Sequence, residues 1–170
     1  LSAMEEHGGV RRGHIVEGLG AAQFALPGAI DAIRSLTTPA PDADPEVLLL
    51  AACDPANPWG AALPWPPTPG HRPSRRAGAL VVLIEGEPVL FVERGARTLL
   101  SFGSEDRLLL TALRELAGHV RAGRLETITI GKCDDQMALG DARFGRLLEE
   151  CGFAMTPRGY RLRHHPSRLA

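Results

Sequence analysis

Proline is concentrated in one stretch of the chain, and this concentration limits what can fold there. Of the 14 prolines among 170 residues, ten lie between Pro39 and Pro73. Proline lacks a backbone N–H and is disfavoured in helix interiors and central strands. Within the stretch only the run VLLLAA at residues 47–52 has the pattern of a strand. That run is apolar on both faces, which predicts burial.

The prolines also divide the chain. The polar, proline-rich run at residues 37–45 is the best linker candidate. Before it, residues 1–36 contain a helix end, two strand-like runs around Gly18-Leu19-Gly20, and a short helix opening at Pro27. This order predicts the C-terminal part of a winged-helix module with its wing. The opening segment has the pattern of a helix tail, so we expect a piece of a longer polypeptide.

Residues 46–170 are expected to form the second module, in which strands outnumber helices. A meander of three antiparallel strands is predicted at residues 79–102, and further strands at 125–130 and near the C-terminus. Two amphipathic helices are predicted, one between Ser104 and Gly123 and one between Asp141 and Gly152. The predicted class is therefore α+β, with a curled antiparallel sheet or small β-barrel-like module carrying two helices.

Charge and cysteine content narrow the function classes. The formal net charge is −1, so a nucleic-acid surface would have to be a local patch. Cys53, Cys133 and Cys151 are far apart, and the six histidines are dispersed except for His164-His165, whose side chains would point to opposite faces of a strand. Neither a disulfide framework nor a metal site is indicated. No apolar run is long enough to cross a membrane, and no targeting segment is evident. We expect a cytoplasmic protein with no membrane partner.

Motifs for catalysis are weak. The only lysine, Lys132, lacks the glycine and hydroxyl residues of a phosphate-binding loop, so no ATPase motor and no cofactor are expected in this chain. The run GLGAAQ at residues 18–23 is interpreted as a wing turn rather than a dinucleotide site. Asp54, Asp134 and Asp135 are acidic candidates at strand ends, and the favoured interpretation is that they are turn residues. No catalytic residue is assigned.

One loop carries a nucleic-acid pattern. No acidic residue lies between Pro55 and Ile84, while Arg72, Arg75 and Arg76 cluster there beside Trp59 and Trp65. Bases stack on aromatic rings while guanidinium groups hold phosphates, which predicts binding of single-stranded DNA. The alternative left open is that the tryptophans pack the loop onto the core.

Two further basic patches are candidates for DNA contact. One is the C-terminal patch, where Arg158, Arg161 and Arg163 occur without an acidic neighbour. The other is Arg11 and Arg12 on the expected wing, because wings commonly contact the DNA backbone. A charged hairpin is equally typical of ordinary solvation.

Four segments carry a resemblance to a known family. They are VRRGHIVEGLGAAQFALPGAIDAIR, DPANPWGAALPWP, GHRPSRRAGALVVLIEGEPVLFVERGARTLL and GFAMTPRGYRLR, in this order. The chain resembles the C-terminal region of the large helicase-related (Lhr) superfamily 2 helicases, known as the DEAD/H-helicase-associated domain. The resemblance extends over nearly the whole chain.

The resemblance implies a parent protein with two RecA-like motor domains, winged-helix modules and a β-barrel-like module. Such a parent would use ATP and magnesium to translocate 3′-to-5′ on DNA in repair, with single-stranded DNA or single-stranded tails as partner. The chain would then be a DNA-binding accessory module that contacts the motor and winged-helix domains. Two alternatives stay open: a base-excision glycosylase domain, although the Gln-x-Gln motif of related glycosylases has no match, and a module for homo-oligomerisation.

Overall fold

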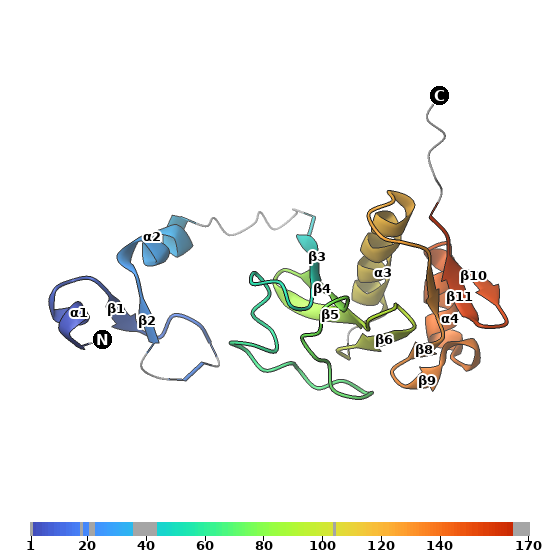
Figure 1. Cartoon of the computed structure of the whole chain (residues 1–170), viewed down its shortest axis with the longest axis horizontal. Helices are drawn as coiled ribbons and strands as arrows, with labels where there is room; N and C mark the ends of the chain where they lie inside the picture. Colours follow the sequence, from blue (N-terminus) through green and yellow to red (C-terminus); the bar gives the residue numbers. More distant parts are fainter. Residues whose placement is uncertain (1, 18, 21–22, 36–43, 104, 165–170) are drawn as a thin grey trace, which may run out of the picture. The chain divides into compact units, whose positions relative to one another are not determined.

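The protein divides into two compact units, Leu1–Asp44 and Pro45–Ala170 (Figure 1). The computed structural model describes residues 2–17, 19–20, 23–35, 44–103 and 105–164. The two units are described separately.

The first unit contains four short elements. They are α1 (Ser2–Glu6), β1 (Arg11–Gly13), β2 (Gln23–Ala25) and α2 (Pro27–Ser35). β1 and β2 pair as an antiparallel hairpin in which Arg12 lies opposite Phe24. The predicted succession of helix, hairpin and helix is confirmed, and α2 begins at Pro27, where the missing N–H costs no helical hydrogen bond.

Gln23 organises the hairpin connection with its side-chain amide. Its Oε1 accepts hydrogen bonds from the backbone N–H groups of Ile15 and Val16, at 2.9 and 2.7 Å. Its Nε2 donates to the carbonyl oxygens of Val16 and Gly20, both at 2.8 Å. The run GLGAAQ is thus part of the hairpin connection, although Gly18 and residues 21–22 lie outside the described residues.

A six-stranded sheet forms the centre of the second unit. Its strand order is β3-β4-β5-β6-β8-β9. The strands are β3 (Val47–Ala51), β4 (Leu80–Ile84), β5 (Glu87–Val92), β6 (Thr98–Ser101), β8 (Lys132–Cys133) and β9 (Gln136–Met137). All neighbours are antiparallel except β6 and β8, which run parallel.

A three-stranded antiparallel sheet, two helices and a short 3-10 helix complete the second unit. The small sheet has the order β10-β11-β7. The elements are β10 (Ala154–Thr156), β11 (Gly159–Leu162), β7 (Ile128–Ile130), α3 (Asp106–Arg121), α4 (Ala142–Glu150) and η1 (Ala138–Gly140).

The central strands β4 and β5 of the large sheet are buried on both faces, and different elements cover the two faces. Strand alternation sends Val82 and Ile84 of β4 into the main apolar cluster, which includes the buried face of α3. It sends Val81 and Leu83 into a second cluster that contains Trp65. Trp65 lies in the segment between β3 and β4, which we call the proline-rich loop. One face is therefore covered by a helix and the other by a loop, which explains why β4 is apolar without alternation.

The structure corrects several expectations about the second unit. The α+β class is confirmed, but the described residues form no closed barrel, because β3 and β9 end an open sheet. The sheet is mixed rather than wholly antiparallel. Across the described residues there are four α-helices, two of them in the second unit.

Of the two predicted helix caps, one is confirmed and the other lies outside the described residues. Glu105 precedes α3 without a side-chain capping bond, while Ser104, the predicted cap, lies outside the described residues. Asp141 caps α4 as predicted, since its Oδ1 accepts from the N–H groups of Arg143 and Phe144 at 2.9 and 3.0 Å.

Candidate nucleic-acid interface

Trp65 is a packing residue in this structure. Its side chain is only 9% exposed. Its ring stacks on Phe102 at 5.8 Å between centroids and meets Phe91 edge-on at 5.6 Å. A base has no free face of this ring to stack on in this conformation, so the structure agrees with the packing alternative.

Trp59 is half-buried against the same cluster. Its Nε1 donates to the carbonyl oxygen of Gly86, in the β4–β5 turn, at 2.9 Å. This bond connects the loop to the sheet across 27 positions of sequence. Trp59 therefore also has a structural role, and a contact with DNA stays a prediction.

The three loop arginines differ in exposure and in their contacts. Arg75 is half-buried, and its guanidinium donates to the carbonyl oxygens of Asn57 and Trp59 and, at 3.0 Å, to that of Asp54. Arg72 and Arg76 are exposed. The three carbonyls satisfy hydrogen-bond donors of the Arg75 guanidinium without neutralising its charge. Contact of Arg72, Arg75 and Arg76 with DNA stays a prediction.

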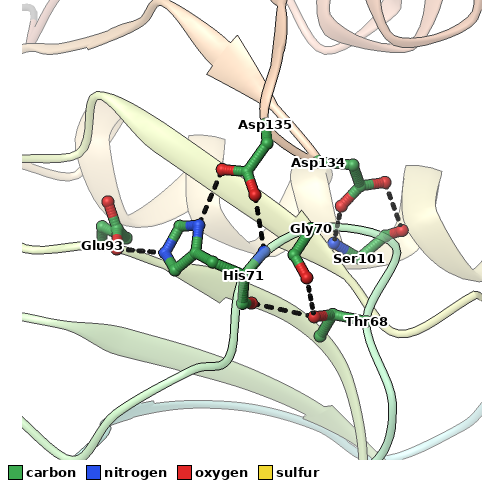
Figure 2. A network of polar contacts seen from close by, with 7 residues as sticks. All are labelled: Thr68, Gly70, His71, Glu93, Ser101, Asp134 and Asp135. Atoms are coloured by element: carbon green, nitrogen blue, oxygen red, sulfur yellow. Dashed lines mark hydrogen bonds and ion pairs between the residues drawn. The ribbon is translucent and has the colours of Figure 1, made fainter.

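His71 fastens the same loop to the sheet between two carboxylates (Figure 2). Its Nε2 lies 2.6 Å from Oε1 of Glu93, and its Nδ1 lies 2.7 Å from Oδ1 of Asp135. Its backbone N–H donates to Oδ2 of Asp135 at 2.6 Å. The side-chain hydrogen bond to Asp135 raises the pKa of His71 most, and the hydrogen bond to Glu93 raises it further. The hydrogen bond with His71 in turn lowers the pKa of Asp135.

The remaining acidic candidates are also engaged in local structure. Asp134 accepts from the N–H and the hydroxyl of the buried Ser101, at 2.6 and 2.7 Å (Figure 2). Asp54 accepts from the N–H of Ala56 at 2.8 Å, as a turn-starting residue does. No described group of three or more His, Cys, Asp or Glu side chains is placed to hold a metal ion.

These contacts change the electrostatic interpretation of the loop. Its sequence contains no acidic residue from 55 to 84, but Glu93 and Asp135 lie against His71. Glu93 also lines a surface hollow together with Arg76 and Arg94. The positive charge of the loop is therefore partly balanced by carboxylates from distant segments, which the sequence could not place.

The C-terminal basic patch lies on the exposed side of the small sheet. Arg158, Arg161 and Arg163 are all exposed, and they line two adjoining hollows. Arg97 and Arg121 line the same hollows, and neither was among the predicted site residues. Arg121 additionally donates to the carbonyl oxygen of Cys151. No local sequence signal connects Arg97 and Arg121 with the C-terminal patch.

On the first unit, Arg11 and Arg12 are both exposed on β1. Adjacent strand residues point to opposite faces, so the two guanidinium groups do not share one surface of the hairpin. Each is accessible for contact with a backbone phosphate.

Comparison with known proteins identifies the lineage. A family model described as the winged-helix domain of large helicase-related protein matches residues 1–45. A protein of Mycolicibacterium smegmatis named "Lhr helicase/ probable uracil glycosylase" is 41% identical over 96% of this chain. The chain is a segment of the large helicase-related family.

A second Lhr relative is similarly close. The Escherichia coli protein named "Lhr helicase/uracil glycosylase" is 39% identical over 92% of the chain. The chain spans 11% and 10% of the lengths of these two Lhr proteins. The first unit is thus the part matched by the Lhr winged-helix model. Among the described residues, no helix has the length and apolar character needed to span a bilayer.

Proposed function

We propose that this chain is a DNA-binding accessory module of an ATP-dependent Lhr-type DNA helicase acting in repair. The observation that carries the proposal is the similarity of nearly the whole chain to Lhr helicases, with the winged-helix match at residues 1–45. ATP and magnesium would act in a motor elsewhere in the parent. The partners would be DNA, the parent's motor and winged-helix domains, and, for self-association, a second copy. Such a protein would work in the bacterial cytoplasm.

The distribution of exposed charge supports DNA binding by both units. The first unit exposes Arg11 and Arg12, and the second exposes Arg158, Arg161 and Arg163. Phosphate contacts are what such side chains supply, because guanidinium groups match phosphate oxygens in a bidentate geometry. A net charge of −1 is compatible with this role, since local field rather than total charge governs the encounter.

The test is a salt titration of DNA binding by the 170-residue chain. Fluorescence anisotropy should detect binding to a tailed duplex, with the logarithm of affinity falling linearly as the logarithm of salt rises, because bound arginines release counterions. ATP should leave the affinity unchanged. Light scattering of the same sample reports self-association. Absence of binding at low salt, with the protein folded by circular dichroism, would contradict the proposed function.

A glycosylase activity is the second candidate, because both relatives carry uracil glycosylase in their names. Base excision requires a polar group able to activate water beside an extruded base. The partly exposed cluster of His71, Glu93 and Asp135 is where we would look for such a group. An arm of the same experiment uses a uracil-containing oligonucleotide followed by alkali. Cleavage that is lost in Asp135→Asn would favour this candidate, and absence of cleavage would remove it.

A further inference from the structure

Five arginines from different segments gather around the exposed side of the small sheet. They are Arg97 before β6, Arg121 at the end of α3, Arg158 in the β10–β11 turn, Arg161 in β11 and Arg163 just beyond it. We call this set the sheet-face arginines. They line two hollows that share Thr156 and Arg161, and no acidic residue lines either hollow. Within the described part of the chain, none of the five forms an ion pair.

Strand alternation directs the central arginines outward. Tyr160 and Leu162 of β11 are buried at 4% and 6% exposure, whereas Arg161 and Arg163 are exposed. Arg161 pairs with Ala154 on one neighbouring strand and with Thr129 on the other. Because both flanking side chains are small, they do not cover the guanidinium group of Arg161 on the exposed side of the small sheet. A long polymer can therefore reach it from either side.

Backbone contacts hold the segments that carry Arg97 and Arg158 beside the small sheet. Gly159 has a φ of +120°, and a Cβ there would lie 2.0 Å from the carbonyl oxygen of Ile130, so glycine is required where the turn approaches β7. The hydroxyl of Thr156 donates to the carbonyl of Gly159 at 2.7 Å, which closes the turn that carries Arg158. The carbonyl of Arg97 accepts from the N–H groups of Gly131 and Lys132, at 2.8 and 3.0 Å. The charges are thus held on a rigid support.

We propose that the sheet-face arginines bind the phosphodiester backbone of DNA, with Arg161 and Arg163 at the centre of the contact. This inference rests on the proposed DNA-binding function and assigns it a surface. No aromatic ring lines the two hollows, so bases have nothing to stack on. Phosphate contact alone carries no sequence information, and the binding is therefore independent of sequence and occurs with single-stranded and duplex DNA.

The experiment compares double variants of the whole chain in a salt titration. Arg161→Ala/Arg163→Ala removes two charges from the sheet face. Arg72→Ala/Arg76→Ala removes two from the proline-rich loop. Arg107→Ala/Arg146→Ala removes two exposed charges from α3 and α4, away from both hollows. Arg161→Lys/Arg163→Lys keeps the charge while changing the side chain. Each protein is titrated with a single strand and with a duplex of scrambled sequence.

We expect the sheet-face alanine pair to lower the salt slope by roughly 1.4 with the single strand and roughly 1.8 with the duplex, since each lost phosphate contact removes roughly 0.7 or 0.9 of a unit, respectively. The lysine pair should keep most of the slope, and the α3/α4 pair should match wild type. If wild-type protein binds while the sheet-face pair leaves the slope unchanged, the surface assignment is wrong but the function stands. A lower salt slope in the Arg72→Ala/Arg76→Ala variant alone would overturn the surface assignment and place DNA binding on the proline-rich loop. Failure of wild type to bind overturns both.

Discussion

At the residue scale, Trp65 shows how one aromatic side chain was open to two interpretations. Tryptophan beside arginine is typical of a stacking site, yet the ring is enclosed by Phe91 and Phe102. Gly60 marks how tight this packing is, because a Cβ at that position would lie 2.1 Å from Nε1 of Trp65. The indole therefore fills space between loop and sheet.

Replacing Trp65 by alanine should lower the free energy of unfolding by about 3 to 5 kcal/mol, the usual range for a buried tryptophan. Urea unfolding measures this loss. Arg72→Ala serves as the exposed control from the same loop and should change stability by less than about 0.5 kcal/mol. DNA affinity per folded molecule should be unchanged in Trp65→Ala. Unaltered stability together with weakened single-strand binding would restore the stacking role.

At the scale of the element, the proline-rich loop is fastened to the sheet by a contact that depends on protonation. Both ring nitrogens of His71 face carboxylates, and only the imidazolium form can donate to both. The pKa of His71 is raised, so its contribution to stability is complete below the ordinary histidine pKa of about 6.5 and is lost as pH rises through the raised pKa.

His71→Gln should therefore destabilise the protein more at pH 6 than at pH 9. The measurement is the difference in melting temperature between wild type and variant across this range. His14→Gln, which removes an exposed histidine from the first unit, is the control and should leave the melting temperature nearly unchanged. The difference in melting temperature between wild type and His71→Gln could instead stay constant or grow toward pH 9. That result would show that the loop contact does not depend on the charge of His71.

The same elements show which parts of the fold could be predicted. β4, β5, α3 and α4 were predictable because each contains enough residues for a local apolar pattern. β8 and β9 have two residues each, too few for any period. Asp134 and Asp135 connect them with φ of 49° and 64°, the left-handed geometry of a tight hairpin turn, and Asp-Asp is not a strong sequence signal for it.

Prediction of the candidate site from the sequence was limited because some of its residues are far apart along the chain. The C-terminal arginines were identifiable because they are close together in sequence. Arg97 and Arg121 join them through the packing of separate elements. Glu93 and Asp135 approach the loop in the same way and offset its charge. Contacts of this kind depend on the tertiary fold, so no inspection of neighbouring letters could find them.

At the scale of the whole molecule, the two units differ in the size of their hydrophobic cores. Both apolar clusters lie in the second unit. In the described part of the first unit, Val10 is the one buried apolar side chain, while Leu26 and Ile33 are 62% and 51% exposed. Burial of apolar surface is the main stabilising term in folding, so stability resides in the second unit.

A chain of residues 45–170 should therefore fold alone. Its melting temperature should be within about 3 °C of that of the full chain, a shift that corresponds to roughly 1 kcal/mol at this size. A peptide of residues 1–44 should show little helix by circular dichroism. Melting of the shortened chain far below the full chain would mean that the first unit contributes core contacts to the second.

The cover of the large sheet by a loop has a consequence for local unfolding. A covering helix is held together by its own backbone hydrogen bonds, whereas the proline-rich loop is attached to the sheet by a few side-chain contacts such as those of His71, Trp59 and Trp65. When these contacts open, the loop can lift without disturbing β4 or β5, exposing Val81 and Phe91 while the rest of the unit stays folded. An uncovered apolar sheet face of this kind favours aggregation, so we expect aggregation of the protein in solution to follow the opening of this loop as well as global unfolding.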